Sequence, residues 1–328
     1  MKGLRSSLGL GLLLGASTIF LGGEAKANEF IYAAGRDGNI YEVNLQLPRS
    51  FSFVTSTGFT GVTGTGVANG LAVDRVRNSL FYFDPNGNLQ VLRRDQPIEQ
   101  VATATQLSLT AQPQNAAFYN GDLWFFTRTS NVLNRIGFTY SGNTPVFNPA
   151  DSEQFTLSSV PNDQTVGNVN SNSFGDIAIT SDGLLFAATS YANPALGTGI
   201  NDGRFFQLNL TILNETAINA SYTPLDASLG IGNLQIAFNP NYDVLYGNGN
   251  PGNWVTIDVT NGNTADLSPT FTTVSPGGSL PNAAGFADLS DSATTVSIPA
   301  PLPVLGATVA FGWSRKLRKR INSSLRSE

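Results

Sequence analysis

The sequence contains no cysteine and no histidine in 328 residues, and only 12% of its residues are charged. Without thiols there is no disulfide framework, no thiolate zinc site and no cysteine nucleophile. Without imidazoles, a histidine base and a histidine metal ligand are excluded as well. Phosphate-binding loops, dinucleotide fingerprints and the Gly-x-Ser-x-Gly nucleophile motif are also missing. The motifs therefore identify no catalytic residue and no metal ligand.

Lysine is absent from the central part of the chain. Residues 28–300 contain nine arginines and 21 acidic residues, a net charge of −12. This charge repels a phosphate backbone, so we predict no nucleic-acid partner. An acidic surface is typical of a soluble exported protein, and an acidic site for cations or basic partners is the alternative.

The first 27 residues have the three parts of a secretory signal peptide. Lys2 and Arg5 are the positive region, Leu8–Leu21 are 14 mostly apolar residues, and Ala25-Lys26-Ala27 is a small-x-small cleavage site. A transmembrane helix needs roughly 17–25 apolar residues. We therefore predict export, with the mature chain beginning at Asn28. An uncleaved N-terminal anchor is the alternative.

The C-terminus has its own three-part pattern. A proline-rich segment at 298–303 precedes an apolar segment that ends at Trp313, and a basic cluster follows it. The 12 mostly apolar residues 302–313 are too few to cross the bilayer core as a straight helix. Basic residues stay on the cytoplasmic side of a membrane. The pattern predicts transient anchoring, with membrane contact only through the terminal segments.

These last 30 or so residues resemble the PEP-CTERM class of sorting signals. Pro299, Ala300 and Pro301 stand where that class has Pro-Glu-Pro, so the middle glutamate is absent. The basic end consists of Arg315, Lys316, Arg318, Lys319 and Arg320. The resemblance implies an exosortase-type protease as partner, removal of the tail, and delivery to the cell surface or the exopolysaccharide matrix. A plain C-terminal membrane anchor is the alternative.

Between the two ends, short β-branched and aromatic runs alternate with glycine, asparagine, aspartate and proline turns. This pattern is typical of an all-β fold. One unit recurs: a strand centred on alanine, a turn, an aromatic strand, a polar turn and a third strand, as in 70–74, 79–83 and 88–92. The central alanines are Ala72, Ala117, Ala178 and Ala237. Alanine suits an innermost strand, where neighbouring strands crowd around an axis.

A fifth copy of the alanine strand lies at Gly285–Asp288, centred on Ala287, and its missing partners are Phe30–Ala33 and Asn39–Val43 at the other end of the chain. This arrangement predicts a β-propeller over 28–292 with five four-stranded blades, closed by pairing of N- and C-terminal strands. Residues 293–328 form a proline-rich linker and the sorting tail. The predicted outer strands are Phe51–Thr55, Gln100–Thr105, Gln154–Leu157, Thr216–Tyr222 and Phe271–Val274. A six- or seven-bladed ring, with a blade hidden between Ala117 and Ala178, a β-sandwich and a β-helix are the alternatives.

The candidate ligand-binding residues lie two positions before the central alanines. Asn115, Asp176 and Gln235 are predicted to line one mouth of the axial tunnel, where amides and a carboxylate can bind a sugar or a cation. They can equally cap strand ends. Asp74 is the fourth candidate. The acids on or near the axial strands are Asp74, Asp176 and Asp288. Of these, Asp74 with Asp176 is the best carboxylate pair for a glycosidase, which requires the two carboxylates roughly 5–10 Å apart in an open cleft.

No cofactor is expected. The one segment with alternating oxygen ligands, as in a calcium loop, is Asp84-Pro85-Asn86-Gly87-Asn88. It lacks the distal bidentate glutamate of such loops, and Asp and Asn-Gly are ordinary turn residues. We predict a turn here, and calcium is the alternative.

Together these patterns predict an exported, surface- or matrix-associated, non-catalytic β-propeller that binds a partner protein or a polysaccharide. One alternative is a carboxylate-dependent glycan hydrolase or lyase. Another is a purely structural envelope protein.

Overall fold

The structure is a computed structural model. It describes residues 30–46, 49–59, 68–127, 132–156, 174–189, 204–210, 221–224, 232–250, 253–267 and 286–291. All of these residues belong to one compact unit, Asn28–Thr294.

In these ranges the chain forms five antiparallel sheets of four strands each. From the axis outward the first three blades are β20 (Phe286–Ser290), β1 (Phe30–Gly35), β2 (Asn39–Asn44), β3 (Ser50–Ser56); β4 (Asn69–Asp74), β5 (Ser79–Phe83), β6 (Leu89–Arg93), β7 (Glu99–Ala102); and β8 (Pro113–Tyr119), β9 (Asp122–Thr127), β10 (Val132–Ser141), β11 (Thr144–Thr156). The other two are β12 (Phe174–Ile179), β13 (Leu184–Thr189), β14 (Arg204–Asn209), β15 (Ser221–Pro224); and β16 (Gly232–Phe238), β17 (Leu245–Asn250), β18 (Asn253–Ile257), β19 (Thr264–Asp266).

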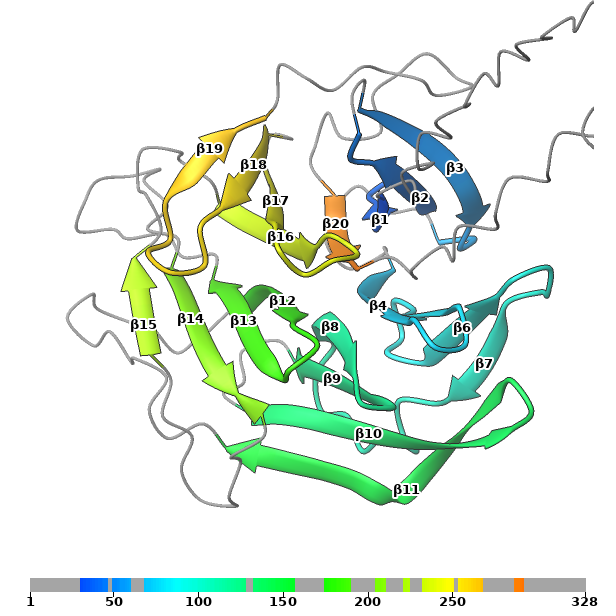
Figure 1. Cartoon of the computed structure of the whole chain (residues 1–328). Helices are drawn as coiled ribbons and strands as arrows, with labels where there is room; N and C mark the ends of the chain where they lie inside the picture. The colour runs from blue at the N-terminus through cyan, green and yellow to red at the C-terminus, as the bar shows by residue number, and fades with distance from the viewer. Residues whose placement is uncertain are drawn as a thin grey trace, which may run out of the picture. The chain divides into compact units, whose positions relative to one another are not determined.

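The first strand of each sheet lies next to the first strand of the next sheet. Each inner strand contacts the next, in the order β20, β4, β8, β12 and β16, and β16 contacts β20 again. The five inner strands therefore form a ring (Figure 1). The chain is therefore a five-bladed β-propeller, as the repeats predict.

The ring is closed by the two ends of the described chain. β20 pairs antiparallel with β1, with Tyr32 opposite Ser290 and Ala34 opposite Asp288. The orange C-terminal strand thus completes the blue N-terminal blade in Figure 1. The predicted closure is confirmed, and it makes the first blade depend on residues about 250 positions apart in the sequence.

Small residues at the axis and aromatic residues between blades explain the repeat pattern. Ala72 and Ala237 are 0% exposed on their inner strands. Rings from neighbouring blades pack together, as with Phe81 and Phe118, whose centroids are 5.4 Å apart. The aromatic positions thus fill the wedges between sheets, where each pair adds about 0.5–1.5 kcal/mol beyond the area it buries.

The closing blade is packed against the last complete blade by three large side chains. Phe51, Trp254 and Phe286 have ring centroids 5.7–6.1 Å from one another. Each of the three is at most 1% exposed. Removing β20 would therefore open a large cavity between β3 and β18, in addition to losing hydrogen bonds to β1.

One predicted strand and one alternative differ from the structure. The outer strand of the last blade is Thr264–Asp266, so the prediction of Phe271–Val274 is wrong for this position, and those four residues lie outside the described ranges. The long interval between Ala117 and Ala178 contains no sixth inner strand in its described part. It contains the extended hairpin of β10 and β11, which have 10 and 13 residues.

Candidate functional site

Five equivalent positions near the start of the inner strands carry a polar residue or glycine. They are Gly70, Asn115, Asp176, Gln235 and Asp288. Each is followed by an apolar residue and then by alanine or serine, the repeated pattern that aligns the five strands.

Asp176 on β12 joins two inner strands through its carboxyl group. Oδ1 accepts the backbone N–H of Ile177 at 2.7 Å, and Oδ2 accepts the N–H of Ile236, on β16, at 2.8 Å. The side chain is 0% exposed. Its first role is therefore to bond the fourth blade to the fifth.

Asp288 on β20 repeats this arrangement one junction further on. Oδ1 accepts the N–H of Leu289 at 3.1 Å, and Oδ2 accepts the N–H of Leu71 on β4. The prediction that centred the fifth copy on Ala287 is therefore wrong: Ser290 occupies the alanine position. Since Asp288 links β20 to β4, it bonds the closing strand to the second blade.

The carboxyl groups of Asp176 and Asp288 also hydrogen-bond to each other. A carboxyl–carboxyl hydrogen bond requires a proton on one of the two groups. Burial raises the pKa of Asp176 well above its usual value, and the charge of Asp288 raises it further. Burial likewise raises the pKa of Asp288, to about 8, while the hydrogen bond from Asp176 and the backbone N–H donors lower it. At neutral pH the pair holds a proton.

The two neutral candidates lie in the same layer. Asn115 is 0% exposed, and its Oδ1 accepts the N–H of Phe126 on β9 at 3.0 Å. Gln235 is 5% exposed. Both amides are thus enclosed by the inner strands, and Asn115 holds the first two strands of its own blade together.

Asp74 is placed differently from Asp176. It ends β4, two residues after Ala72, whereas Asp176 lies two residues before Ala178. Its Oδ2 accepts hydrogen bonds from Arg77 Nη1 at 3.0 Å and from the Tyr140 hydroxyl at 3.2 Å. The structure thus pairs Asp176 with Asp288 rather than with Asp74. Asp74 is 1% exposed, so the open cleft that the hydrolase alternative requires is not formed by Asp74 and Asp176.

The pattern search missed Asp291, which follows β20 directly. Its Oδ1 accepts the N–H of Phe238 at 2.8 Å, and its Oδ2 lies 3.3 Å from Arg75 Nη2. Burial raises the pKa of Asp291 to about 6, and the Arg75 charge acts in the opposite direction. Its position three residues after Asp288, in line with Val73, Phe118, Ile179 and Phe238 in the other repeats, is a signal that could have identified it.

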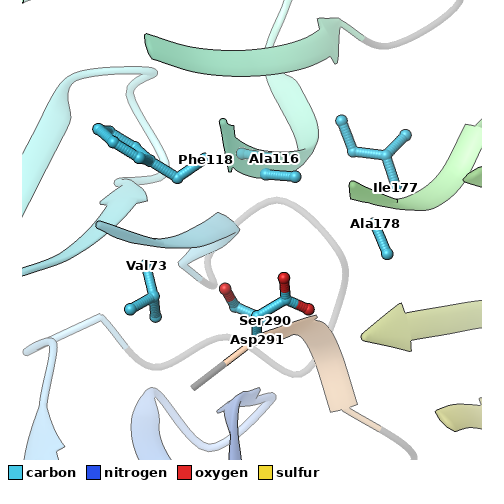
Figure 2. Close-up of a pocket in the computed structure, with 8 residues that line it drawn as sticks. Val73, Ala116, Phe118, Ile177, Ala178, Ser290 and Asp291 are labelled. Carbon is cyan, nitrogen blue, oxygen red and sulfur yellow. The ribbon is translucent and has the colours of Figure 1, made fainter. Parts of the chain in front are cut away.

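A shallow pocket opens on the axis beside Asp291. Its lining residues are Val73, Ala116, Ala117, Phe118, Ile177, Ala178, Ser290 and Asp291. Figure 2 shows Ser290 and Asp291 between side chains of three other inner strands. The walls leave no room for an enclosed water molecule, so the axis is packed at this level.

The predicted turn at Asp84 is confirmed. Asp84 Oδ1 accepts the N–H groups of Asn86 and Asn88, and Oδ2 accepts the side-chain amides of Asn88 and Gln90. These four bonds, 2.8–3.1 Å long, account for the loop geometry. In the described part of the chain no group of three acidic side chains is placed so that it could hold a metal ion. The calcium alternative stays a prediction.

The processing signals lie outside the described residues. This applies to the signal peptide at 1–27 and to the whole sorting tail, including Pro299, Ala300, Pro301 and the basic cluster. Among the residues that the structure does describe, no helix has the length and apolar character needed to cross a membrane.

No protein-family model and no curated protein matches this sequence. A chain of a nidogen–laminin complex is 11% identical, with 79% of this chain and 84% of that chain covered and a TM-score of 0.38. A proposed 6-phosphogluconolactonase from Bacteroides uniformis is 14% identical over 74% of this chain and 67% of its own, with a TM-score of 0.39. A protein from Lactobacillus plantarum is 12% identical over 77% and 69%, with a TM-score of 0.37. These likenesses are too weak to transfer a function.

Proposed function

We propose that this chain is an exported, non-catalytic β-propeller that binds a polysaccharide or a surface protein at the cell surface or in the extracellular matrix. The terminal sequences support export: a three-part secretory signal at 1–27, and a tail that resembles PEP-CTERM signals at 298–320. An exosortase-type protease is the processing partner that this tail implies.

The binding proposal rests on the observation that the axial acids form hydrogen bonds within the protein. Asp176 and Asp288 accept backbone N–H groups from neighbouring inner strands, and Asp74 binds Arg77 and Tyr140. These carboxylates hold the ring together, and all three are at most 1% exposed. We therefore propose the outer surface of the blades, rather than the axis, as the place of recognition.

One aromatic side chain on that surface suits a sugar. Phe53 lies on β3, the outermost strand of the closing blade, and is 52% exposed. Its inner side rests edge-on against Tyr41, with ring centroids 6.5 Å apart, which fixes its orientation. A fixed aromatic ring with a free face offers a sugar an apolar contact at low entropic cost.

Binding is tested on residues 28–294 with a glycan array and with matrix polysaccharide. We expect Phe53→Ala to weaken polysaccharide binding at least fivefold. Val146→Ala is the matched control, because Val146 is 49% exposed on another outer strand, β11. Equal binding by both variants would remove Phe53 from the site, and no binding by the unaltered protein would favour the purely structural alternative.

Export is tested separately in the native cells. Mass spectrometry of the mature protein is expected to find Asn28 as its first residue and to find the tail removed. Serine substitutions in the basic cluster are expected to leave the tail attached, and those residues are Arg315, Lys316, Arg318, Lys319 and Arg320. Retention of the unaltered protein in the cytoplasm would contradict the localisation.

A further inference from the structure

We propose that Asp176 and Asp288 form a proton-dependent clasp, which holds the closing strand β20 in the ring and weakens when the shared proton is removed. The clasp is defined by these two carboxyl groups. It joins four inner strands. Asp176 on β12 bonds Ile236 on β16, and Asp288 on β20 bonds Leu71 on β4.

The location of the clasp lets it affect the stability of the whole ring. β20 contributes only five residues to the first blade, and its side neighbours are β4 and β16. β20 is the inner strand of the first blade, so its release removes the contacts of that blade with β4 and β16 and opens the ring. A weakened bond elsewhere on the axis would leave the remaining junctions in place.

The chemical setting makes the clasp depend on one proton. Both side chains are 0% exposed. With the proton present, one carboxyl group donates to the other. Without it, two negative charges face each other at hydrogen-bonding distance in a medium that screens them poorly.

The residues around Asp176 and Asp288 at this level of the ring carry no charge that could compensate the charge of the two carboxylates. β20 packs against β1, β4, β8, β12, β16 and β17. At the level of the pair these strands contribute Ala34, Gly70, Leu71, Asn115, Gln235 and Asn248, none of which titrates. Arg75 and Asp291 pair with each other beyond the other end of the strand.

The sign follows from linkage. The pKa values of Asp176 and Asp288 are raised in the folded protein above their unfolded values. The stability that the protonated carboxyl groups contribute is fully present below their unfolded pKa values and is lost as pH rises. Asp288 loses its proton first, at about pH 8, because its hydrogen bond with Asp176 lowers its pKa, and the shared proton on Asp176 is lost after it. Alkaline conditions, rather than acid, are expected to loosen the ring.

The test measures melting temperature between pH 6 and pH 10 for residues 28–294. We expect the unaltered protein to lose about 5–10 °C more across this range than Asp176→Asn/Asp288→Asn, which has no proton to lose. Asp95→Asn is the control, since the Asp95 side chain is 88% exposed, and it should follow the unaltered protein. An identical pH response in all three proteins would overturn the proposal.

Two further measurements remain informative if the double variant fails to fold. Infrared spectra of the unaltered protein at pH 7 should show protonated carboxylic acid, and the signal should be weaker in Asp176→Asn, which has lost one of the two buried carboxyl groups. A disulfide from Tyr32→Cys with Ser290→Cys, which are opposite each other in β1 and β20, should remove the alkaline loss of melting temperature. Absence of the infrared signal at pH 7 would rule out the shared proton.

Discussion

Arg75 and Asp291 form an ion pair between the turn that follows β4 and the end of β20, with 3.3 Å between Nη2 and Oδ2. Arg75 also donates to the carbonyl of Pro240 at 2.8 Å and lies 4.0 Å from the ring centroid of Tyr242. One guanidinium thus contacts the second blade, the last blade and the closing strand. The closing strand is therefore held at two places, by Asp288 in its middle and by Asp291 directly after its last residue.

The ion pair predicts a loss of stability in Arg75→Ala. Asp291 would keep its hydrogen bond from Phe238 and lose the cationic partner that Arg75 provides, so we expect a decrease of about 2 kcal/mol in the free energy of unfolding at pH 7. Urea unfolding measures it. Arg94→Ala is the control, because the Arg94 side chain is 80% exposed.

The same variant changes the pH dependence. The pKa of Asp291 is raised to about 6, chiefly by burial, so its contribution to stability is present below its unfolded pKa and lost as pH rises through about 6. Arg75 lowers this pKa, so Arg75→Ala is expected to raise it further and to move the loss to higher pH. A carboxyl resonance of Asp291 that titrates at the same pH in both proteins would contradict this explanation.

Closure of the ring predicts a sharp effect of chain length. A chain that ends at residue 285 lacks β20, with the buried side chains of Phe286 and Leu289, whereas a chain that ends at residue 294 retains them. We expect cooperative thermal unfolding only for the longer chain. Cooperative unfolding of the shorter one would mean that the first blade is stable as three strands.

The backbone conformation and close packing at Gly70 predict that an alanine substitution there lowers the free energy of unfolding. Gly70 has φ of +64°, and a Cβ atom there would lie 2.6 Å from Phe83 Cδ2. We expect Gly70→Ala to lower the free energy of unfolding by about 2–4 kcal/mol, from backbone strain and overpacking together. Gly58 has φ of +76° with nothing within 4 Å of a Cβ, so Gly58→Ala should show the backbone part alone, about 1 kcal/mol. Equal losses would assign the whole effect to backbone strain.

The sequence predicted the propeller because its constraint is local and repeated. Each of four inner strands has a buried alanine at its centre, where neighbouring strands leave room only for a small side chain. These residues are Ala72, Ala117, Ala178 and Ala237. The fifth register was missed because Ser290 replaces the alanine there, while Ala287 lies close by. The wider pattern of polar, apolar and small residues, as in Asp288-Leu289-Ser290, would have identified it.

The carboxyl pair was beyond the reach of sequence patterns. Asp176 and Asp288 were both identified as acids on or near the axial strands, but which two of them pair depends on which equivalent positions lie across the ring from each other. Asp74 was chosen because it is near an axial alanine. However, it lies two residues after Ala72, whereas Asp176 lies two residues before Ala178, so the two acids are at opposite ends of their strands. Spacing along one strand cannot show which blades meet at the axis, since that depends on the closed ring.

The turn at Asp84 predicts a loss of stability that calcium does not affect. Asp84→Ala leaves four donors without their acceptor, two of them backbone N–H groups, and we expect the free energy of unfolding to fall by about 2–3 kcal/mol. Thermal unfolding with calcium or with a chelator measures the cation's part. Asp258→Ala is the control: Asp258 also forms a turn, and its acceptor bonds to Thr260 and Asn261 are exposed. If calcium raises the melting temperature of the unaltered protein and of Asp258→Ala but not of Asp84→Ala, the loop is a cation site and the hydrogen-bonded turn describes only its calcium-free form.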